Sequence, residues 1–233
     1  MLNGVVYRST GSWYDVKLED GTFIKSRIKG KFRTKGLRTT NPLAVGDCVQ
    51  LIKNETGEYI IDEIQERKNY IIRKSVNLSK EAHIIASNID LAVLLVTISN
   101  PVTATGFIDR FTVTAEAYHI PLHIIFNKID LYNDTDQKTL HKWESTYSKA
   151  NYNNLCISAK TGEGLDELSA LIADKTTLIA GNSGAGKSTL INQIIPNLAL
   201  KTGNISTTHM TGKHTTTFAA VSYTHLRAHE TDR

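Results

Sequence analysis

The stretch that determines the fold of this chain is Thr177-Leu178-Ile179-Ala180-Gly181-Asn182-Ser183-Gly184-Ala185-Gly186-Lys187-Ser188-Thr189. It reads as an apolar strand, a glycine-rich loop and the start of a helix, and residues 181–188 match the P-loop pattern G-x-x-x-x-G-K-[ST]. Glycines let the backbone close around phosphate oxygens, and the N–H groups of a helix N-terminus attract an anion. The stretch therefore predicts a site for the phosphates of a nucleotide.

The P-loop pattern also assigns individual roles. The Lys187 amine is expected to reach the β- and γ-phosphates, as the first candidate catalytic residue, and the Ser188 hydroxyl to ligate Mg²⁺. A glycine-rich turn without a ligand is the competing interpretation, and the strand before the loop and the helix after it argue against that. The predicted phosphate-binding residues are Gly181, Asn182, Ser183, Gly184, Ala185, Gly186, Lys187, Ser188 and Thr189.

Two shorter motifs indicate which base is bound. Asn127-Lys128-Ile129-Asp130 follows an apolar strand and resembles the N-K-x-D motif of GTPases. Guanine presents N1–H and a 2-amino group side by side; the Asp130 carboxylate can accept from both, and adenine has no such pair. The 158–160 segment resembles the S-A-K loop, whose backbone N–H reads guanine O6. The predicted guanine-binding residues are Asn127, Lys128, Asp130, Ser158, Ala159 and Lys160.

Strands and helices alternate over the rest of this region. Apolar strands are predicted at 89–98, 121–126, 155–157 and 177–180, and helices at 106–119, 134–150, 165–172 and 187–195. The first helix has a predicted apolar face of Phe107, Phe111, Ala115 and Tyr118. This alternation predicts an α/β fold with a parallel sheet between helices, whose strand ends meet at one crevice.

The order of the motifs is unusual. Conventional GTPases carry the P-loop before N-K-x-D, whereas here N-K-x-D comes first, S-A-K second and the P-loop third. Such a circular permutation is permissible because domain termini commonly lie close together on the surface. The fold class predicted for 89–221 is a circularly permuted P-loop GTPase domain.

Residues 1–66 have a different pattern. Short alternating strands with turn signals, such as 13–18 and 23–28 around Asp20-Gly21, predict a small all-β barrel of the OB-fold type. A basic stretch without acidic residues lies within it, and OB-folds often bind nucleic acid through basic and aromatic residues. A merely solvated basic face is the alternative. The predicted RNA-binding residues are Lys25, Arg27, Lys29, Lys31, Arg33, Lys35 and Arg38, and 67–88 is predicted to be a polar linker.

Composition narrows the class of protein. The longest apolar run, 91–98, is far shorter than the roughly 20 residues of a membrane span, and we expect no signal peptide. The two cysteines, Cys48 and Cys156, are not in a paired motif, which argues against a disulfide framework or a zinc site. A reducing cytoplasm is the expected location.

Together these residues resemble the ribosome small-subunit-dependent GTPase A family, over residues 1 to about 220. The resemblance includes 29–33 (Lys-Gly-Lys-Phe-Arg) and 212–217 (Gly-Lys-His-Thr-Thr-Thr). It implies a monomeric GTPase that uses Mg²⁺ to convert GTP to GDP during late maturation of the small ribosomal subunit, is stimulated by that particle, and contacts its RNA through the barrel. It also implies that Thr216 coordinates Mg²⁺ in the GTP state and that His214 assists hydrolysis.

The resemblance ends after Val221. The family continues into further strands, a D-x-P-G motif and a zinc-binding module, so we expect 222–233 to be a non-native tail and the 177–180 strand to be an exposed apolar edge. We therefore expect weak GDP binding and poor hydrolysis from this chain. Two alternatives stay open: an RNA-binding module whose nucleotide site is not catalytic, and an ATP-using P-loop enzyme, against which Asp130 argues.

Overall fold

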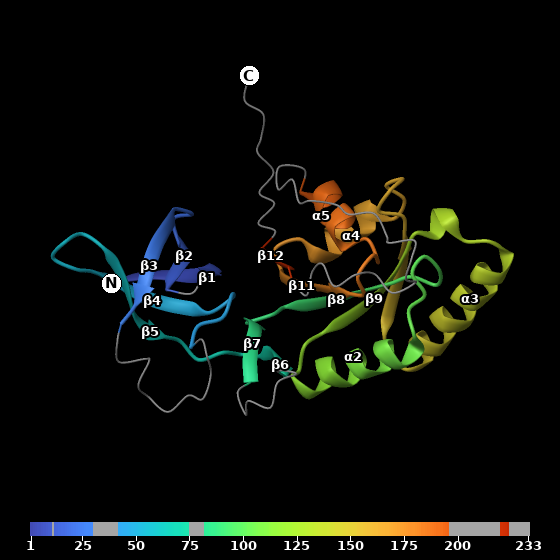
Figure 1. Cartoon of the computed structure of the whole chain (residues 1–233), viewed down its shortest axis with the longest axis horizontal. Coiled ribbons are helices and arrows are strands. Elements are labelled where there is room, and N and C mark those ends of the chain that lie inside the picture. Colours follow the sequence, from blue (N-terminus) through green and yellow to red (C-terminus); the bar gives the residue numbers. More distant parts are fainter. Residues whose placement is uncertain (11, 30–41, 75–81, 196–219, 224–233) are drawn as a thin grey trace, which may run out of the picture. The chain divides into compact units, whose positions relative to one another are not determined.

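The structure is a computed structural model that describes residues 1–10, 12–29, 42–74, 82–195 and 220–223 (Figure 1). The chain divides into two compact units, Met1–Ile89 and Asp90–Arg233, which we call the N-terminal unit and the C-terminal unit.

The N-terminal unit contains a closed five-stranded barrel, as predicted. Its strands pair in the order β1-β2-β3-β5-β4, and only the β3–β5 pairing is parallel. Alternating residues point inward and pack around Val6, Tyr14, Val16, Leu51 and Ile61, each at most 1% exposed. The strands are β1 (Leu2–Thr10), β2 (Trp13–Leu18), β3 (Phe23–Ile28), β4 (Cys48–Lys53) and β5 (Tyr59–Ile64).

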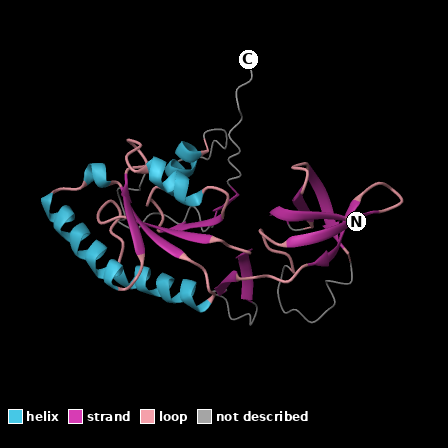
Figure 2. Ribbon diagram, turned by 180° about the vertical axis from the view of Figure 1, so that it is seen from behind, coloured by secondary structure: helices cyan, strands magenta, loops and turns pink. Residues whose placement is uncertain are grey.

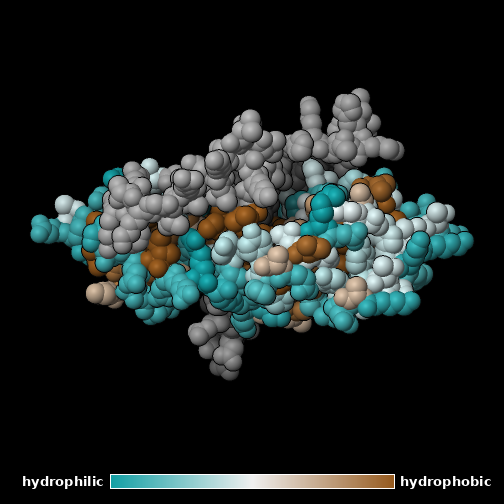
Figure 3. All heavy atoms as spheres, turned by 90° about the horizontal axis from the view of Figure 1, so that it is seen from below, coloured by the Kyte–Doolittle hydropathy of each residue, from teal (hydrophilic) through white to brown (hydrophobic). Residues whose placement is uncertain are grey.

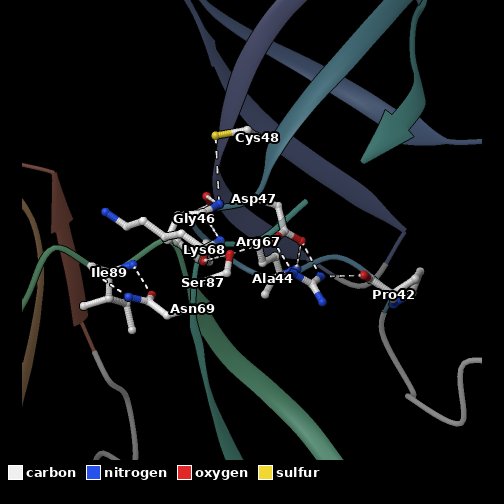
Figure 4. A network of polar contacts seen from close by, with 12 residues as sticks. Pro42, Ala44, Gly46, Asp47, Cys48, Arg67, Lys68, Asn69, Ser87 and Ile89 are labelled. Atoms are coloured by element: carbon white, nitrogen blue, oxygen red, sulfur yellow. Dashed lines mark hydrogen bonds and ion pairs between the residues drawn. The ribbon is translucent and has the colours of Figure 1, made fainter. Parts of the chain in front are cut away.

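The segment predicted to be a linker contains an antiparallel strand pair, β6 (Tyr70–Lys74) and β7 (Ala82–Ser87). A buried ionic network ties this segment to the barrel (Figure 4). The fully buried Asp47 accepts from Arg67 Nε and Nη2, each at 2.6 Å, and from Ser87 Oγ at 2.6 Å. This hydrogen bonding raises the pKa of Arg67. The network makes the strand pair part of the N-terminal unit.

The C-terminal unit is built on a five-stranded sheet in the order β10-β9-β8-β11-β12. The first four strands are parallel and β12 is antiparallel to β11. Every residue of β8 is buried, as expected for a central strand covered on both faces. The strands are β8 (Leu91–Val96), β9 (Leu122–Asn127), β10 (Asn153–Ile157), β11 (Thr176–Gly181) and β12 (Ala220–Tyr223).

Helices cover both faces of the sheet, with α2 and α3 on one side and α4 and α5 on the other, as Figure 1 and the reverse view in Figure 2 show. On the second side, Leu168, Ile172, Leu190 and Ile191 pack into one core cluster with residues of β8, β9, β10 and β11. The helices are α2 (Thr105–Ala117), α3 (Asp134–Lys149), α4 (Leu165–Ile172) and α5 (Lys187–Ile194), and a short 3-10 turn spans Ile129–Leu131.

Two expectations about this unit are wrong. The buried face of α2 is Ile108, Thr112 and Ala115, so Phe107, Phe111 and Tyr118 are only partly buried. The β11 strand is not an edge, because β12 pairs with it along Thr176–Ile179. Two of the β12 residues, Ser222 and Tyr223, come from the segment that we expected to be a tail, and their backbone bonds satisfy the edge of β11.

On the face shown in Figure 3, hydrophobic residues form small groups among hydrophilic ones. Among the described residues, no helix is long and apolar enough to cross a membrane.

Candidate nucleotide-binding site

The predicted site lies at one edge of the sheet. Because β8, β9, β10 and β11 are parallel, their carboxyl ends meet at the same edge, which is where open α/β sheets bind ligands. The loops that leave this edge begin at Thr97, Lys128, Ser158 and Asn182. The topology therefore brings the N-K-x-D, S-A-K and P-loop residues together although they are far apart in the chain.

The P-loop has the backbone conformation that requires glycine. Gly181, Gly184 and Gly186 have φ values of 151°, 80° and 100°. A Cβ atom on Gly181 would lie 2.5 Å from the Leu95 carbonyl oxygen, and one on Gly186 would lie 2.4 Å from Asn127 Nδ2. The loop can thus pack closely against its neighbours only with glycine at positions 181 and 186.

The Lys187 amine folds back over the P-loop. Its Nζ donates to the carbonyl oxygens of Gly181 and Asn182, both at 2.8 Å. Partial burial lowers the pKa of Lys187, because the charged amine loses hydration. An anion in the loop would supply the missing counter-charge, which suits a phosphate ligand.

Asn127 connects the three motifs. Its side chain is 1% exposed, its Nδ2 donates to the Ala185 carbonyl at 2.8 Å, and its Oδ1 accepts from the Ala159 N–H at 2.9 Å. These two bonds also fix the orientation of the amide, since each end has a matching partner. One buried side chain therefore sets the distance between the P-loop and the S-A-K loop.

Asp130 is held by the S-A-K loop. The Ser158 hydroxyl donates to Asp130 Oδ1 at 2.6 Å and accepts from the Thr161 N–H at 3.1 Å. Ser158 itself is fully buried, whereas Asp130 is exposed at the edge of the sheet. The carboxylate is thus oriented by a rigid partner and faces solvent, where a ligand can reach it.

Lys128 stands beside this carboxylate in a left-handed conformation, with φ 68°. Its Nζ donates to the Asn100 carbonyl at 2.6 Å, across to the loop that follows β8. Burial lowers the pKa of Lys128, and the nearby Asp130 charge partly opposes that shift. The amine is therefore anchored at its far end, which extends the aliphatic stem along the edge of the site.

Some of the remaining predicted residues lie in the described part of the structure, and the others lie outside it. Thr189 lies in the first turn of α5, and Lys160 is exposed at the S-A-K loop. His214, Thr216, Lys31, Arg33, Lys35 and Arg38 lie outside the described residues.

The donor set fits Mg²⁺ only together with a nucleotide. In the described part of the chain, no group of three or more His, Cys, Asp or Glu residues could hold a metal ion. Ser188, next to Lys187 at the start of α5, offers one hydroxyl ligand at the P-loop. Such a site suits Mg²⁺, which commonly takes few protein ligands and completes its shell with phosphates and water.

The barrel adds aromatic residues that the sequence prediction missed. The Arg27 guanidinium lies 4.0 Å from the centre of the Trp13 ring, and Lys17 Nζ lies 5.8 Å from the centre of the Phe23 ring. The strand alternation at 13–18 and 23–28 could have revealed them, because it places them on the outer face with Lys25. Lys29 Nζ forms an ion pair with Asp62 at 2.6 Å, and its contact with RNA stays a prediction.

Two family models match this chain, and their matches meet between residues 61 and 64, ahead of the boundary between the two units after Ile89. The family model for the RsgA N-terminal domain matches residues 3–61, and the model for the RsgA GTPase matches residues 64–227. The second match extends past Val221, where we expected the resemblance to end.

Two relatives carry the name small ribosomal subunit biogenesis GTPase. RsgA 2 of Bacteroides thetaiotaomicron is 51% identical over 218 residues, and RsgA of Christiangramia forsetii is 53% identical over 223 residues. Each alignment covers 94% of this chain and 70% of the relative.

Two solved structures are similar. YjeQ from Thermotoga maritima has a TM-score of 0.70 at 34% identity, covering 90% of this chain and 68% of that one. YloQ, described as a circularly permuted GTPase, has a TM-score of 0.65 at 31% identity, covering 84% of this chain and 66% of that one. With these matches, the permuted motif order and the barrel, the chain belongs to the RsgA family of GTPases.

Proposed function

We propose that this chain binds GTP at the edge of the sheet, hydrolyses it to GDP and phosphate, and acts in maturation of the small ribosomal subunit, in keeping with the name small ribosomal subunit biogenesis GTPase that its relatives carry. The expectation of weak GDP binding and poor hydrolysis rested partly on an exposed β11 edge, and β12 pairs with that edge. The observation that carries the proposal is the Asn127 side chain, which holds the P-loop and the S-A-K loop beside Asp130. Phosphate binding and base recognition then belong to a single preformed site.

The base is recognised by fixed groups. Asp130 accepts from N1–H and the 2-amino group of guanine, and Ser158 keeps the carboxylate in place. Because the Ala159 N–H donates to Asn127, guanine O6 accepts from the next donor along the loop, the Lys160 backbone N–H. The Lys128 stem covers one face of the purine.

The phosphates lie in the P-loop, against the backbone N–H groups of 182–189 and the N-terminus of α5. Mg²⁺, held by Ser188 and Thr216, would neutralise charge on the β- and γ-phosphates when it is bound with the nucleotide. The Lys187 ammonium exchanges its two carbonyl partners for phosphate oxygens and stabilises the charge that develops as water attacks in line. His214 assists the attacking water.

The outer face of β1, β2 and β3 contacts ribosomal RNA. Arg27 over Trp13 and Lys17 over Phe23 each combine a ring, on which a base can stack, with a cation for a phosphate. Lys25 adds charge to the same face. The proposal also includes Lys31, Arg33, Lys35 and Arg38 as RNA-binding residues on the basis of the sequence. Lys29 joins them once RNA competes with Asp62, because an exposed ion pair contributes little stability. The protein works as a cytoplasmic monomer.

GTP turnover tests this proposal. Phosphate release is measured for the whole chain with and without purified small ribosomal subunits, for the unsubstituted chain and for Lys187→Ala. We expect stimulation by the particle, and a loss of about 100-fold in the lysine variant, as for other charge-stabilising groups. Binding to the particle without turnover would instead favour an RNA-binding module with a non-catalytic nucleotide site. Equal turnover of ATP would favour an ATP-using enzyme.

A further inference from the structure

Tyr132 joins two loops at the edge of the sheet, and no predicted motif includes it. It follows the 3-10 turn Ile129–Leu131 and stands just before α3. Its hydroxyl donates to the Asn127 carbonyl at 2.7 Å and accepts from the Ile98 N–H at 2.9 Å. The loop after β9 and the loop after β8 are therefore connected through one oxygen atom.

The loop after β8 is itself held firmly. The Thr97 hydroxyl donates to the Pro101 carbonyl at 2.6 Å, and the Thr97 N–H donates to Thr103 Oγ1 at 3.1 Å. Ser99 Oγ donates to Asp136 Oδ2 at 3.0 Å, which attaches the loop to α3. This loop is a fixed support rather than a loose connection.

Lys128 is anchored to the loop after β8, because its Nζ donates to the carbonyl of Asn100 in that loop. The Asn127 backbone is held by Tyr132, whose hydroxyl donates to the Asn127 carbonyl. The Asn127 side chain in turn bonds to Ala185 and Ala159. Two of the four N-K-x-D positions thus depend on contacts to the loop after β8.

We propose that Tyr132 is a positioning residue for the guanine nucleotide. Its hydroxyl holds Asn127 and Lys128 in the arrangement that the ligand needs, and so links the loop after β8 to nucleotide affinity. This inference rests on the proposed function, because it takes a guanine nucleotide as the ligand. The hydroxyl can donate throughout the physiological range, since burial raises the pKa of Tyr132 to about 12.

Removal of the hydroxyl takes away one hydrogen-bond partner from the Ile98 N–H and one from the Asn127 carbonyl. Ile98 is 6% exposed and Asn127 is 1% exposed, so water reaches their backbone only if the loops move apart. Apparent affinity falls in proportion to the fraction of molecules that keep the competent arrangement. Nucleotide binding then weakens although Tyr132 touches no part of the nucleotide.

The test compares two tyrosines of the same region. Tyr132→Phe keeps the ring and removes the hydroxyl. Tyr147→Phe is the matched control, because the hydroxyl of the buried Tyr147 donates to Asp109 Oδ1 at 2.9 Å, on the α2 side of α3 and away from the four loops. For each variant of the 233-residue chain, GDP affinity is measured by competition with a fluorescent GDP analogue, and stability by thermal unfolding.

We expect Tyr132→Phe to bind GDP roughly tenfold more weakly, which corresponds to about one molecule in ten keeping the competent arrangement. Tyr147→Phe loses stability but binds GDP as the unsubstituted chain does. Equal GDP affinity in Tyr132→Phe overturns the inference, as does an equal loss in both variants, which would reflect stability alone.

Should Tyr132→Phe fail to fold, Ser99→Ala replaces it, because it removes the anchor of the same loop to α3. We expect GDP binding to weaken several-fold there, and unchanged affinity contradicts the inference. Failure of the unsubstituted chain to prefer GDP over ADP is a different result: it refutes the proposed function, and the inference with it.

Discussion

Replacing Asn127 by alanine tests the centre of the proposed site. The substitution removes the donor to Ala185 and the acceptor from Ala159, and both residues are at most 2% exposed. A buried polar group left without a partner costs about 1–3 kcal/mol, so two such groups could cost about 2–6 kcal/mol. Local relaxation admits some water, and we therefore expect a loss of about 2–4 kcal/mol in the unfolding free energy of the C-terminal unit.

Tryptophan fluorescence makes the measurement specific to that unit. The chain has two tryptophans, Trp13 in the N-terminal unit and Trp143 in the C-terminal unit. In a Trp13→Phe background, urea unfolding followed by fluorescence reports only the C-terminal unit. The matched control is Asn154→Ala, whose side-chain amide donates to Ser148 Oγ at 2.8 Å near the surface and should cost less than about 1 kcal/mol.

Amide hydrogen exchange locates the effect. The Ala159 N–H should lose its protection in Asn127→Ala, because its acceptor is gone, and GDP affinity should fall together with it. If Asn127→Ala costs no more than Asn154→Ala and the Ala159 amide stays protected, then Asn127 does not hold the loops together and the reasoning is refuted.

Three further predictions concern other parts of the molecule. Arg67→Met leaves the buried Asp47 charge without its partner and should cost the N-terminal unit about 3–5 kcal/mol in urea unfolding; a loss below about 1 kcal/mol would contradict this. Gly186→Ala places a methyl group 2.4 Å from Asn127 Nδ2 at a φ of 100°, so GDP affinity measured by titration should fall about 10- to 100-fold, and unchanged affinity would exclude the steric argument. Burial lowers the pKa of His123, so the folded state binds fewer protons than the unfolded state below about pH 6.5. The unfolding free energy should therefore decrease as the pH falls from about 7.5 to 5.5, and an equal decrease in His123→Gln would show that this residue is not the cause.

Local sequence patterns predicted the main elements of the fold. The P-loop at 181–188 identifies its own strand and helix, and the strands predicted at 89–98 and 121–126 correspond to β8 (Leu91–Val96) and β9 (Leu122–Asn127). The alternation in 13–18 and 23–28 likewise predicted the barrel. In each of these elements, the glycine or hydrophobic pattern that predicts the element lies within the residues that form it.

Contacts between distant residues were not predictable in this way. The strand pair in 70–87 has only short apolar runs inside a polar segment, and its connection to the barrel depends on Asp47 and Arg67, which no local motif relates. The face of α2 was misread because Phe107 and Phe111 form a helical stripe of their own, although the smaller Ile108 and Thr112 pack inward.

The candidate site likewise combines residues that local motifs predicted with contacts between distant residues that they did not. The motifs named Asn127 and Asp130, but the Tyr132 hydroxyl lies outside every motif and acquires its partners only when the loops after β8 and β9 meet. Trp13 and Phe23 were not named because the predicted RNA-binding residues were chosen from the basic stretch, although aromatic residues were expected of an OB-fold in general. The ion pair of Lys29 with Asp62 likewise requires the parallel pairing of β3 with β5.

The most direct test of the account is the choice of nucleotide. The whole chain is titrated with a fluorescent GDP analogue, and unlabelled GDP or ADP is then added in competition, for the unsubstituted chain and for Asp130→Asn. We predict that GDP displaces the analogue and ADP does not, and that Asp130→Asn reduces this preference. Equal displacement by ADP would contradict the assignment of the site to guanine.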